Sequence, residues 1–182
     1  LLKKINPLFI IHAAAISNVE SCEFNQINAL KINVEITKNI SEVCSDLGIK
    51  LIGIDDAETI DLAIDGADEV SPDLALIKGL GGALLREKKV ERKAKELIII
   101  IDESKLVKKL GEGFLPVEIN SSNYKNILIQ ISKLECETQL RIESDNQPFV
   151  TDNGNYICHC KFKNGISNPR ELDKNIMKID GV

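Results

Sequence analysis

Four carboxylates stand in the stretch ‘DLAIDGADEV’, residues 61–70, on and just after a short apolar run. Asp65, Asp68 and Glu69 are close together in it, and a glycine follows the first of these acids. Acids in this arrangement can cap a solvated turn, bind a hard divalent cation, or move protons as general acids and bases. The neighbouring residues distinguish these three kinds of chemistry.

A glycine-rich stretch, ‘IKGLGGAL’, leads into a predicted helix over residues 82–96. In it Lys78 precedes Gly79, Gly81 and Gly82. Glycines allow backbone N–H groups to approach a ligand closely, and the dipole of a helix favours negative charge at its N-terminus. The stretch therefore predicts binding of an anionic ligand.

Glu87 lies on the apolar face of that predicted helix, in one stripe with Ala83, Val90 and Ala94. It has no lysine or arginine three or four positions further on, so no local ion pair is expected. An inward carboxylate of this kind is either paired across the fold or kept for chemistry. Burial would raise its pKa towards the range of a general base at neutral pH.

The candidate acids and lysines follow the ends of predicted strands. Asp65 directly follows a predicted strand, Leu62–Ile64, while Asp102 and Lys105 follow another, Leu97–Ile101. In open parallel sheets ligands bind beyond the carboxyl ends of the strands, so neighbouring strands would place these side chains in one crevice. Carboxylates and lysines without a Ser/His or Cys/His pair suit proton transfer next to a carbonyl, with a lysine stabilising the enediolate oxygen.

Uninterrupted apolar strands alternating with helices predict an α/β fold with a Rossmann-like, mostly parallel sheet. After ‘FLPVEI’ the strands become shorter and alternating, which favours a second, smaller α+β domain. We therefore expect domains at 1–118 and 119–182. The remaining expected strands are Leu8–Ala15, Ile32–Ile36 and Lys50–Ile54, and the remaining helices are Val19–Leu30, Ser41–Leu47, Tyr124–Leu134 and Pro169–Lys178.

The 182 residues, 43% hydrophobic and 28% charged, are typical of a globular protein. The net charge of −5 argues against a nucleic-acid partner, and no segment is long enough to span a membrane. Five irregularly spaced cysteines indicate reduced thiols in a cytoplasmic protein. We interpret Cys158-His159-Cys160 as strand side chains rather than metal ligands, and the apolar N-terminus as a buried strand rather than a signal peptide.

The stretches ‘DGADEV’, ‘LIKGLGGALLREK’, ‘DESKLV’, ‘LPVEI’ and ‘TDNGN’ occur in the order and at the spacings of the type A ribose-5-phosphate isomerases. The sequence resembles this family from about residue 37 onward. The resemblance implies interconversion of ribose 5-phosphate and ribulose 5-phosphate through an enediolate, in the non-oxidative branch of the pentose phosphate pathway. It also implies that no metal or organic cofactor takes part, and that the protein is a cytoplasmic homodimer or homotetramer.

The same resemblance implies a role for each matching residue. Glu87 is similar to the general base, Asp65 to the acid/base that opens the sugar ring, and Asp68 to the aspartate that holds the hydroxyls. Lys78 resembles the lysine that stabilises the oxyanion, and Lys105 the second substrate lysine. Backbone donors to the sugar would come from Gly79, Gly81 and Gly82, with Leu80 in place of a usual glycine.

The N-terminal region departs from the family pattern. Aligning the family's phosphate-binding loop with ‘AAISN’ leaves Ser17 and Asn18 as possible donors, but both glycines of the loop are replaced. Thr37 in ‘TKNIS’ matches a second phosphate-binding signature. Because the first helix and the segments after ‘IDGV’ are also missing, the sequence is expected to be truncated at both ends.

Three functions are therefore distinguished. The first is an active aldose–ketose isomerase acting on a sugar phosphate. The second is a catalytically inactive sugar-phosphate-binding domain with a degraded phosphate loop. The third is a divalent-metal site built from Asp65, Asp68 and Glu69.

Overall fold

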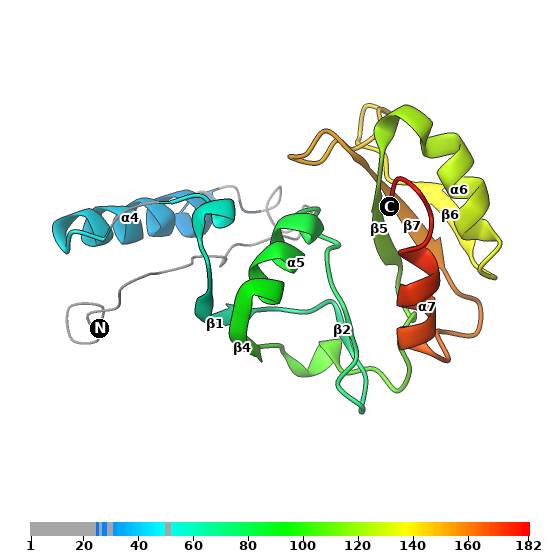
Figure 1. Ribbon diagram of the computed structural model, residues 1–182, viewed down its shortest axis with the longest axis horizontal. Helices are drawn as coiled ribbons and strands as arrows, with labels where there is room; N and C mark the ends of the chain where they lie inside the picture. The colour runs from blue at the N-terminus through cyan, green and yellow to red at the C-terminus, as the bar shows by residue number, and fades with distance from the viewer. Residues whose placement is uncertain (1–24, 26, 29–30, 50–51) are drawn as a thin grey trace. The chain divides into compact units, whose positions relative to one another are not determined.

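The computed structural model describes residues 25, 27–28, 31–49 and 52–182 (Figure 1). The predicted strand Leu8–Ala15 and most of the predicted helix Val19–Leu30 lie outside these ranges. The helices are a π-helix at Lys31–Glu35, α4 (Ile36–Asp46), α5 (Leu84–Lys93), α6 (Tyr124–Ser132) and α7 (Pro169–Ile176), with short 3₁₀ helices at Ile54–Asp56, Glu103–Lys105 and Ser121–Asn123. The strands are β1 (Ile60–Asp65), β2 (Glu69–Val70), β3 (Leu76–Ile77), β4 (Ala94–Ile99), β5 (Leu115–Ile119), β6 (Glu137–Leu140) and β7 (Tyr156–Lys161).

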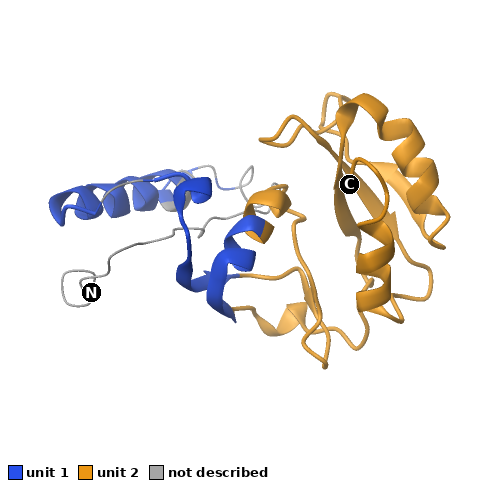
Figure 2. Ribbon diagram, in the orientation of Figure 1, with its two compact units in different colours: residues 1–65, 89–98 blue, residues 66–88, 99–182 orange. Residues whose placement is uncertain are grey.

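The chain divides into two compact units (Figure 2). Unit 1 comprises residues 1–65 and 89–98, and unit 2 comprises residues 66–88 and 99–182. These units differ from the expected domains, because unit 2 runs through residue 118. The domain boundary expected there stays a prediction.

In unit 1, β1 pairs with β4, which meets the condition that these two strands be neighbours. Lys95 Nζ lies 2.6 Å from Asp61 Oδ1 and links the two strands at the surface. Lys93 Nζ donates to the backbone oxygens of Ile54 and Ala57, both at 2.8 Å. The end of α5 is thereby attached to the turn that precedes β1.

One predicted strand is wrong, and a second lies partly outside the described residues, at Lys50 and Leu51. The stretch expected as strand Ile32–Ile36 is a π-helix that runs into α4, which itself begins well before the predicted Ser41. Its alternating apolar residues fit a strand, but extending an existing helix by one turn costs less than starting a separate element. Of the expected strand Lys50–Ile54, the described end differs, because Ile54 begins a 3₁₀ helix in which the Asp56 carboxylate accepts a hydrogen bond from the Gly53 N–H at 3.2 Å.

The helix predicted at 82–96 is shorter, and β4 begins earlier than the predicted Leu97. Gly82 has φ +100, which is incompatible with an α-helix, so α5 begins only at Leu84. At the other end, pairing with β1 converts Ala94 and the residues after it to strand. The β-branched run that follows favours this conformation.

Unit 2 contains an antiparallel sheet of order β5-β7-β6. Leu115 pairs with Cys160 and Ile119 with Tyr156 across β5 and β7, while Leu140 pairs with Cys158 across β6 and β7. The helices predicted at Tyr124–Leu134 and Pro169–Lys178 are confirmed as α6 and α7. The placement of Cys158, His159 and Cys160 on a strand is confirmed as well.

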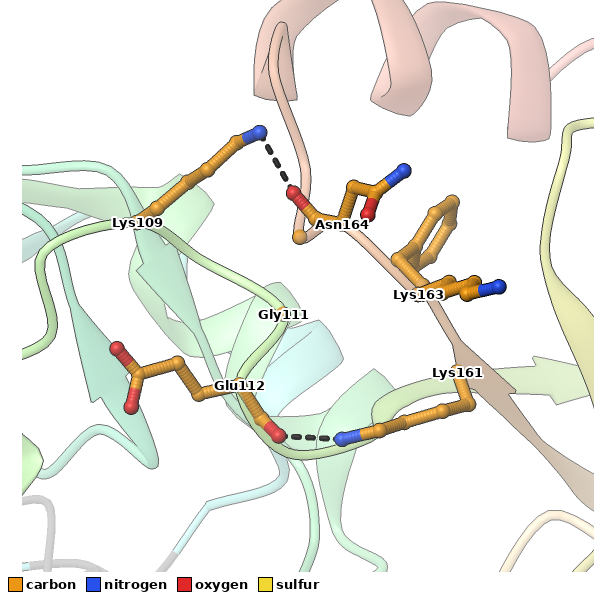
Figure 3. A pocket seen from close by; sticks show the side chains of 8 residues that line it. Lys109, Gly111, Glu112, Lys161, Lys163 and Asn164 are labelled. Atoms are coloured by element: carbon orange, nitrogen blue, oxygen red, sulfur yellow. Dashed lines mark hydrogen bonds between the residues drawn. The ribbon is translucent and has the colours of Figure 1, made fainter.

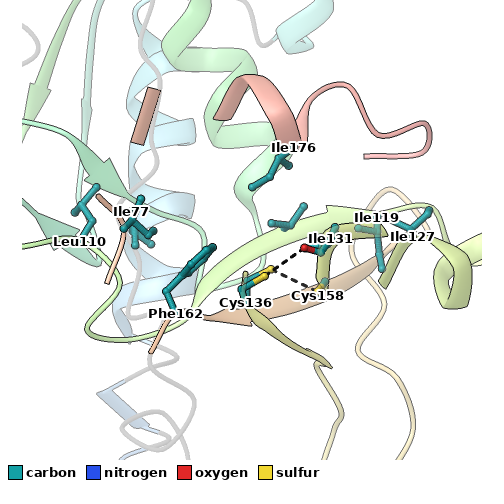
Figure 4. Packing of buried hydrophobic residues seen from close by; sticks show 12 residues of the cluster. Ile77, Leu110, Ile119, Ile127, Ile131, Cys136, Cys158, Phe162 and Ile176 are labelled. Atoms are coloured by element: carbon teal, nitrogen blue, oxygen red, sulfur yellow. Dashed lines mark hydrogen bonds between the residues drawn. The ribbon is translucent and has the colours of Figure 1, made fainter. Parts of the chain in front are cut away.

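One hydrophobic cluster joins α6 and α7 to the same face of this sheet (Figure 4). Its wholly buried members include Ile127 and Ile131 of α6 and Cys158 and Cys160 of β7. Hydrogen bonds with the neighbouring thiols and burial raise the pKa of Cys160, so this thiol is neutral and packs as a small apolar group. The cluster makes unit 2 a rigid support for the segments attached to it.

A short antiparallel pair, β2 with β3, lies before α5, with Glu69 opposite Ile77 and Val70 opposite Leu76. A parallel bridge joins Val70 to Leu106, and the Val107 N–H donates to the Val70 oxygen at 2.9 Å. The segment after β4 is thereby aligned beside β2. No helix in the described ranges is both long enough and apolar enough to cross a membrane.

His159 of β7 stacks on Phe114, with ring centroids 5.1 Å apart and planes inclined by 16°. Its Nε2 atom is buried and meets no hydrogen-bond partner within the described part of the chain. Burial and the positive charge of Arg141 lower the pKa of His159 below its ordinary value. The folded protein therefore holds this imidazole in its neutral form.

We expect the free energy of unfolding to fall as the pH decreases below about 6.5, because the unfolded chain then binds a proton at His159 that the folded chain does not. In His159→Phe this loss should be smaller, by at most about 1.4 kcal/mol per pH unit. Urea unfolding of both proteins between pH 7 and pH 5 measures the difference. Equal pH dependence in the two proteins would contradict this account.

Candidate active site

Lys78 and Glu87 form an ion pair in unit 2. Lys78 Nζ lies 3.4 Å from Glu87 Oε2, and the side chains are only 14% and 23% exposed. Lys78 directly follows β3, and Glu87 lies in the first turn of α5, where the helix dipole stabilises a carboxylate. The inward Glu87 is therefore paired across the fold, and its use in chemistry stays a prediction. A carboxylate is a side chain that can act as a general base.

Lys78 is also held by the backbone of the ‘DGADEV’ stretch. Its Nζ donates to the Gly66 oxygen at 2.5 Å, and Gly66 is the residue after Asp65 in the chain. Two partners thus fix the position of the ammonium group. A lysine fixed in this way can stabilise negative charge without having to reorganise.

The glycine-rich stretch forms a tight turn, closed by a 3.0 Å hydrogen bond from the Gly82 N–H to the Gly79 oxygen. Gly79 has φ +97 and Gly82 has φ +100. A Cβ atom would lie 2.5 Å from Leu84 Cβ at the first position and 2.7 Å from Phe149 Cζ at the second. Only glycine fits either place, while the approach of these backbone N–H groups to a ligand stays a prediction.

Asp68 binds this turn, since its Oδ2 accepts a hydrogen bond from the Leu80 N–H at 3.0 Å. Glu69, the next residue, is 6% exposed and accepts hydrogen bonds from the backbone N–H groups of Gly111, at 2.6 Å, and Gly113. The two adjacent carboxylates therefore have different partners. In the described ranges no group of three or more His, Cys, Asp or Glu side chains is arranged to hold a metal ion.

The other predicted site residues lie as follows. Asp65 ends β1 and is half-buried. Lys105 is the last residue of the 3₁₀ helix Glu103–Lys105, which Asp102 caps by accepting a 2.8 Å hydrogen bond from the Ser104 N–H. Hydrogen bonds from Ser104 lower the pKa of the Asp102 carboxyl, as fits an acid with a capping role. Thr37 is exposed in the first turn of α4, and Ser17 and Asn18 lie outside the described residues.

The stretches ‘LPVEI’ and ‘TDNGN’ meet through Glu118. Its Oε1 accepts hydrogen bonds from Thr151 Oγ1 at 2.8 Å and from the side-chain amides of Asn153 and Asn155, both at 3.0 Å. The loop that Glu118 holds also carries Asp152, 2.9 Å from Arg86 Nη1, but those side chains are 61% and 63% exposed. An exposed pair contributes at most about 1 kcal/mol. Glu118 therefore has the larger part in holding the loop.

Sequence reasoning assigned no role to Arg141 and Phe149, although both contact the glycine turn. Arg141 Nη1 donates to the Leu80 oxygen at 2.9 Å, and the Phe149 ring lies against Gly82. Arg141 stands in an alternating stretch, where an arginine has the pattern of any exposed strand residue. The sequence carries no signal for this contact.

A pocket of about 260 Å³ lies elsewhere in unit 2, between the loops 109–113 and 161–165 (Figure 3). Lys109 Nζ donates to the Asn164 oxygen at 2.7 Å, and Lys161 Nζ donates to the Glu112 oxygen. Both ammonium groups thus bind backbone of the loops themselves. No predicted site residue lines the pocket, which we interpret as a junction between the two loops.

The chain is similar to known proteins over most of its length. The model of the family described as ribose 5-phosphate isomerase A (phosphoriboisomerase A) matches residues 32–182. A second family model, described as polysaccharide biosynthesis protein, matches residues 1–56. A relative from Bacillus mycoides, named ribose-5-phosphate isomerase A, is 50% identical over 149 residues, which are 82% of this chain and 67% of the relative.

Solved structures are similar in sequence and in fold. A D-ribose-5-phosphate isomerase in complex with phospho-erythronic acid is 36% identical, with a TM-score of 0.69 over 78% of this chain and 62% of that one. Ribose 5-phosphate isomerase A from Methanocaldococcus jannaschii is 38% identical, with a TM-score of 0.68 over 78% and 63%. The expected α/β fold class is thereby confirmed. The chain spans about two thirds of the length of the proteins it matches.

Glu69→Gln should lower the free energy of unfolding by about 1–3 kcal/mol, because one carboxylate oxygen becomes an amide that faces a backbone N–H. Urea unfolding measures this loss. The exposed Glu112 provides a matched control, and Glu112→Gln should change stability by less than about 0.5 kcal/mol. Equal stability of the two variants would show that Glu69 does not hold the loop.

Proposed function

Because the chain belongs to the ribose 5-phosphate isomerase A family, we propose that it interconverts ribose 5-phosphate and ribulose 5-phosphate. The observation that carries the proposal is the largely buried Lys78–Glu87 pair beside the glycine turn, with 3.4 Å between Nζ and Oε2. It combines a base with a cation that can stabilise the charge produced by proton removal. The relatives carry the name of this activity, and the chain covers about two thirds of their length.

In the proposed reaction, the Glu87 carboxylate removes the proton from C2 of the open-chain aldose and returns it to C1. The electron pair of the broken C–H bond moves into the enediolate, whose oxygen is stabilised by Lys78 Nζ. The site needs both groups within reach of the same pair of carbon atoms, and their mutual distance of 3.4 Å supports this. Proton transfer by a positioned carboxylate contributes about 10²–10⁴-fold to the rate.

The remaining roles are proposed from the family resemblance. Asp65 opens the sugar ring and moves the hydroxyl protons, Asp68 holds the hydroxyls, and Lys105 is the second lysine at the substrate. Backbone N–H groups of the turn at Gly79, Gly81 and Gly82 bind the sugar. Ser17, Asn18 and Thr37 bind the phosphate in this proposal, the first two from a stretch outside the described residues.

We further propose that the reaction uses no metal or organic cofactor, since the base and the electrostatic stabiliser are side chains of the chain itself. A homodimer or homotetramer is proposed from the family resemblance, and sedimentation analysis would test it. The free thiols Cys44, Cys136, Cys158 and Cys160 and the bacterial relatives support a cytoplasmic location.

One observation favours the second function, a sugar-phosphate-binding domain without turnover. The isomerase family model begins at residue 32, so the stretch 14–18 aligned with the phosphate loop lies outside its match. Those residues fall instead in the match to the polysaccharide biosynthesis family. A weak hold on the phosphate would leave the proton-transfer groups in place with little turnover.

The deciding measurement is conversion of ribose 5-phosphate to the ketose by this chain in the presence of EDTA. We expect turnover that EDTA does not reduce and that Asp65→Asn reduces strongly, because an amide can neither donate nor accept the ring-opening proton. Turnover abolished by EDTA would favour the divalent-metal hypothesis. Binding of phospho-erythronic acid without turnover would favour the inactive binding domain.

Glu87→Gln should lower kcat by about 10²–10⁴-fold while the Kd for phospho-erythronic acid changes little, because the amide keeps the shape of the side chain but cannot accept the C2 proton. A coupled assay for the ketose and a calorimetric titration measure the two quantities. Glu58 is exposed, and Glu58→Gln serves as the control with unchanged kcat. Near-normal kcat in Glu87→Gln would refute Glu87 as the base.

A further inference from the structure

The Leu80 residue in the middle of the glycine turn is held from both sides. Its N–H donates to Asp68 Oδ2 at 3.0 Å, and its carbonyl oxygen accepts from Arg141 Nη1 at 2.9 Å. Both partners carry a charge, which strengthens each of these hydrogen bonds. Asp68 precedes the turn closely in sequence, whereas Arg141 comes from a segment 61 positions further on.

Arg141 is itself fixed to the β5-β7-β6 sheet. Its N–H donates to the Ile157 oxygen of β7 at 2.8 Å, and its own oxygen accepts from the Phe149 N–H at 3.0 Å. The guanidinium carbon lies 3.8 Å from the centroid of the Phe149 ring. A planar guanidinium stacked on an aromatic ring loses little further freedom when it donates a hydrogen bond.

The same two side chains contact the end of the turn. A Cβ atom at Gly82 would lie 2.7 Å from Phe149 Cζ and 3.2 Å from Arg141 Nη1. The Gly82 N–H in turn closes the turn through the Gly79 oxygen at 3.0 Å. Arg141 and Phe149 therefore hold the turn at its middle and at its last residue.

We propose that Arg141 is a positioning residue that sets the direction of the Gly81 N–H, a proposal that rests on the isomerase function. The Leu80 carbonyl and the Gly81 N–H belong to one peptide group, which is planar and trans, so they point in opposite directions. When Arg141 holds the carbonyl, the N–H is fixed on the opposite side. Within the described ranges this N–H donates no hydrogen bond, so it is available to a substrate hydroxyl or developing oxyanion.

Kinetics of Arg141→Ala test the proposal. We expect kcat for ribose 5-phosphate to fall by about 10–100-fold with little change in KM, because a misdirected donor weakens binding of the transition state more than binding of the substrate. Millimolar guanidinium chloride should restore part of this kcat, and Arg141→Lys, which can donate but cannot stack, should be intermediate. The exposed Arg92 supplies the control, and Arg92→Ala should behave as the wild type.

A second readout does not depend on activity. In the ligand-free protein, the ¹⁵N–¹H resonance of Gly81 should shift in Arg141→Ala and stay in place in Arg92→Ala. If the wild type has no turnover, the isomerase function fails, and this resonance alone decides the role of Arg141. An unchanged Gly81 resonance in Arg141→Ala overturns the proposal whatever the kinetics. If Arg141→Ala does not fold, Arg141→Lys and Phe149→Leu replace it, and wild-type Gly81 resonances in both overturn the proposal.

Discussion

The candidate site depends on keeping two opposite charges largely out of water. An ammonium group and a carboxylate lose hydration when they are buried, and their attraction offsets this loss only when other groups help. Here the Gly66 carbonyl contacts Lys78, and the N-terminus of α5 stabilises Glu87. Lys78 directly follows β3 and Glu87 lies in α5, and the glycine turn connects the two in the chain. The conformation of this turn therefore sets the distance between the two charges.

The acids of ‘DGADEV’ do not form one cluster. Asp68 binds the Leu80 N–H, and Glu69 binds the backbone of Gly111 and Gly113. Asp68 lies in a bend and Glu69 is the first residue of β2, so the two adjacent acids have different surroundings. One of them supports the turn beside the ion pair, and the other fixes a loop of unit 2. Acids crowded in sequence thus act separately in space.

The parts of this site that were predictable from the sequence are local. The period of a helix predicts that Glu87 faces inward. The conformational range of glycine predicts the tight turn, and the length of the apolar run predicts that β1 ends near Asp65. The partner of Glu87 was not predictable, because the sequence predicts side-chain pairs only between residues three or four positions apart on the same helix. The contact from Arg141 to Leu80 joins residues 61 positions apart and has no local pattern. The π-helix at Lys31–Glu35 was mistaken for a strand because a short apolar run fits both periods.

The support of Leu80 has a consequence for how this region tolerates change. Both of its hydrogen bonds use backbone atoms, and its side chain is 36% exposed. Its φ is not positive, so a side chain costs no backbone strain there, in contrast to Gly79 and Gly82. Within the turn, Leu80 therefore has a main chain held by two hydrogen bonds, and its side chain is less restricted than those at Gly79 and Gly82. A leucine is therefore compatible with the backbone conformation of the turn at this position.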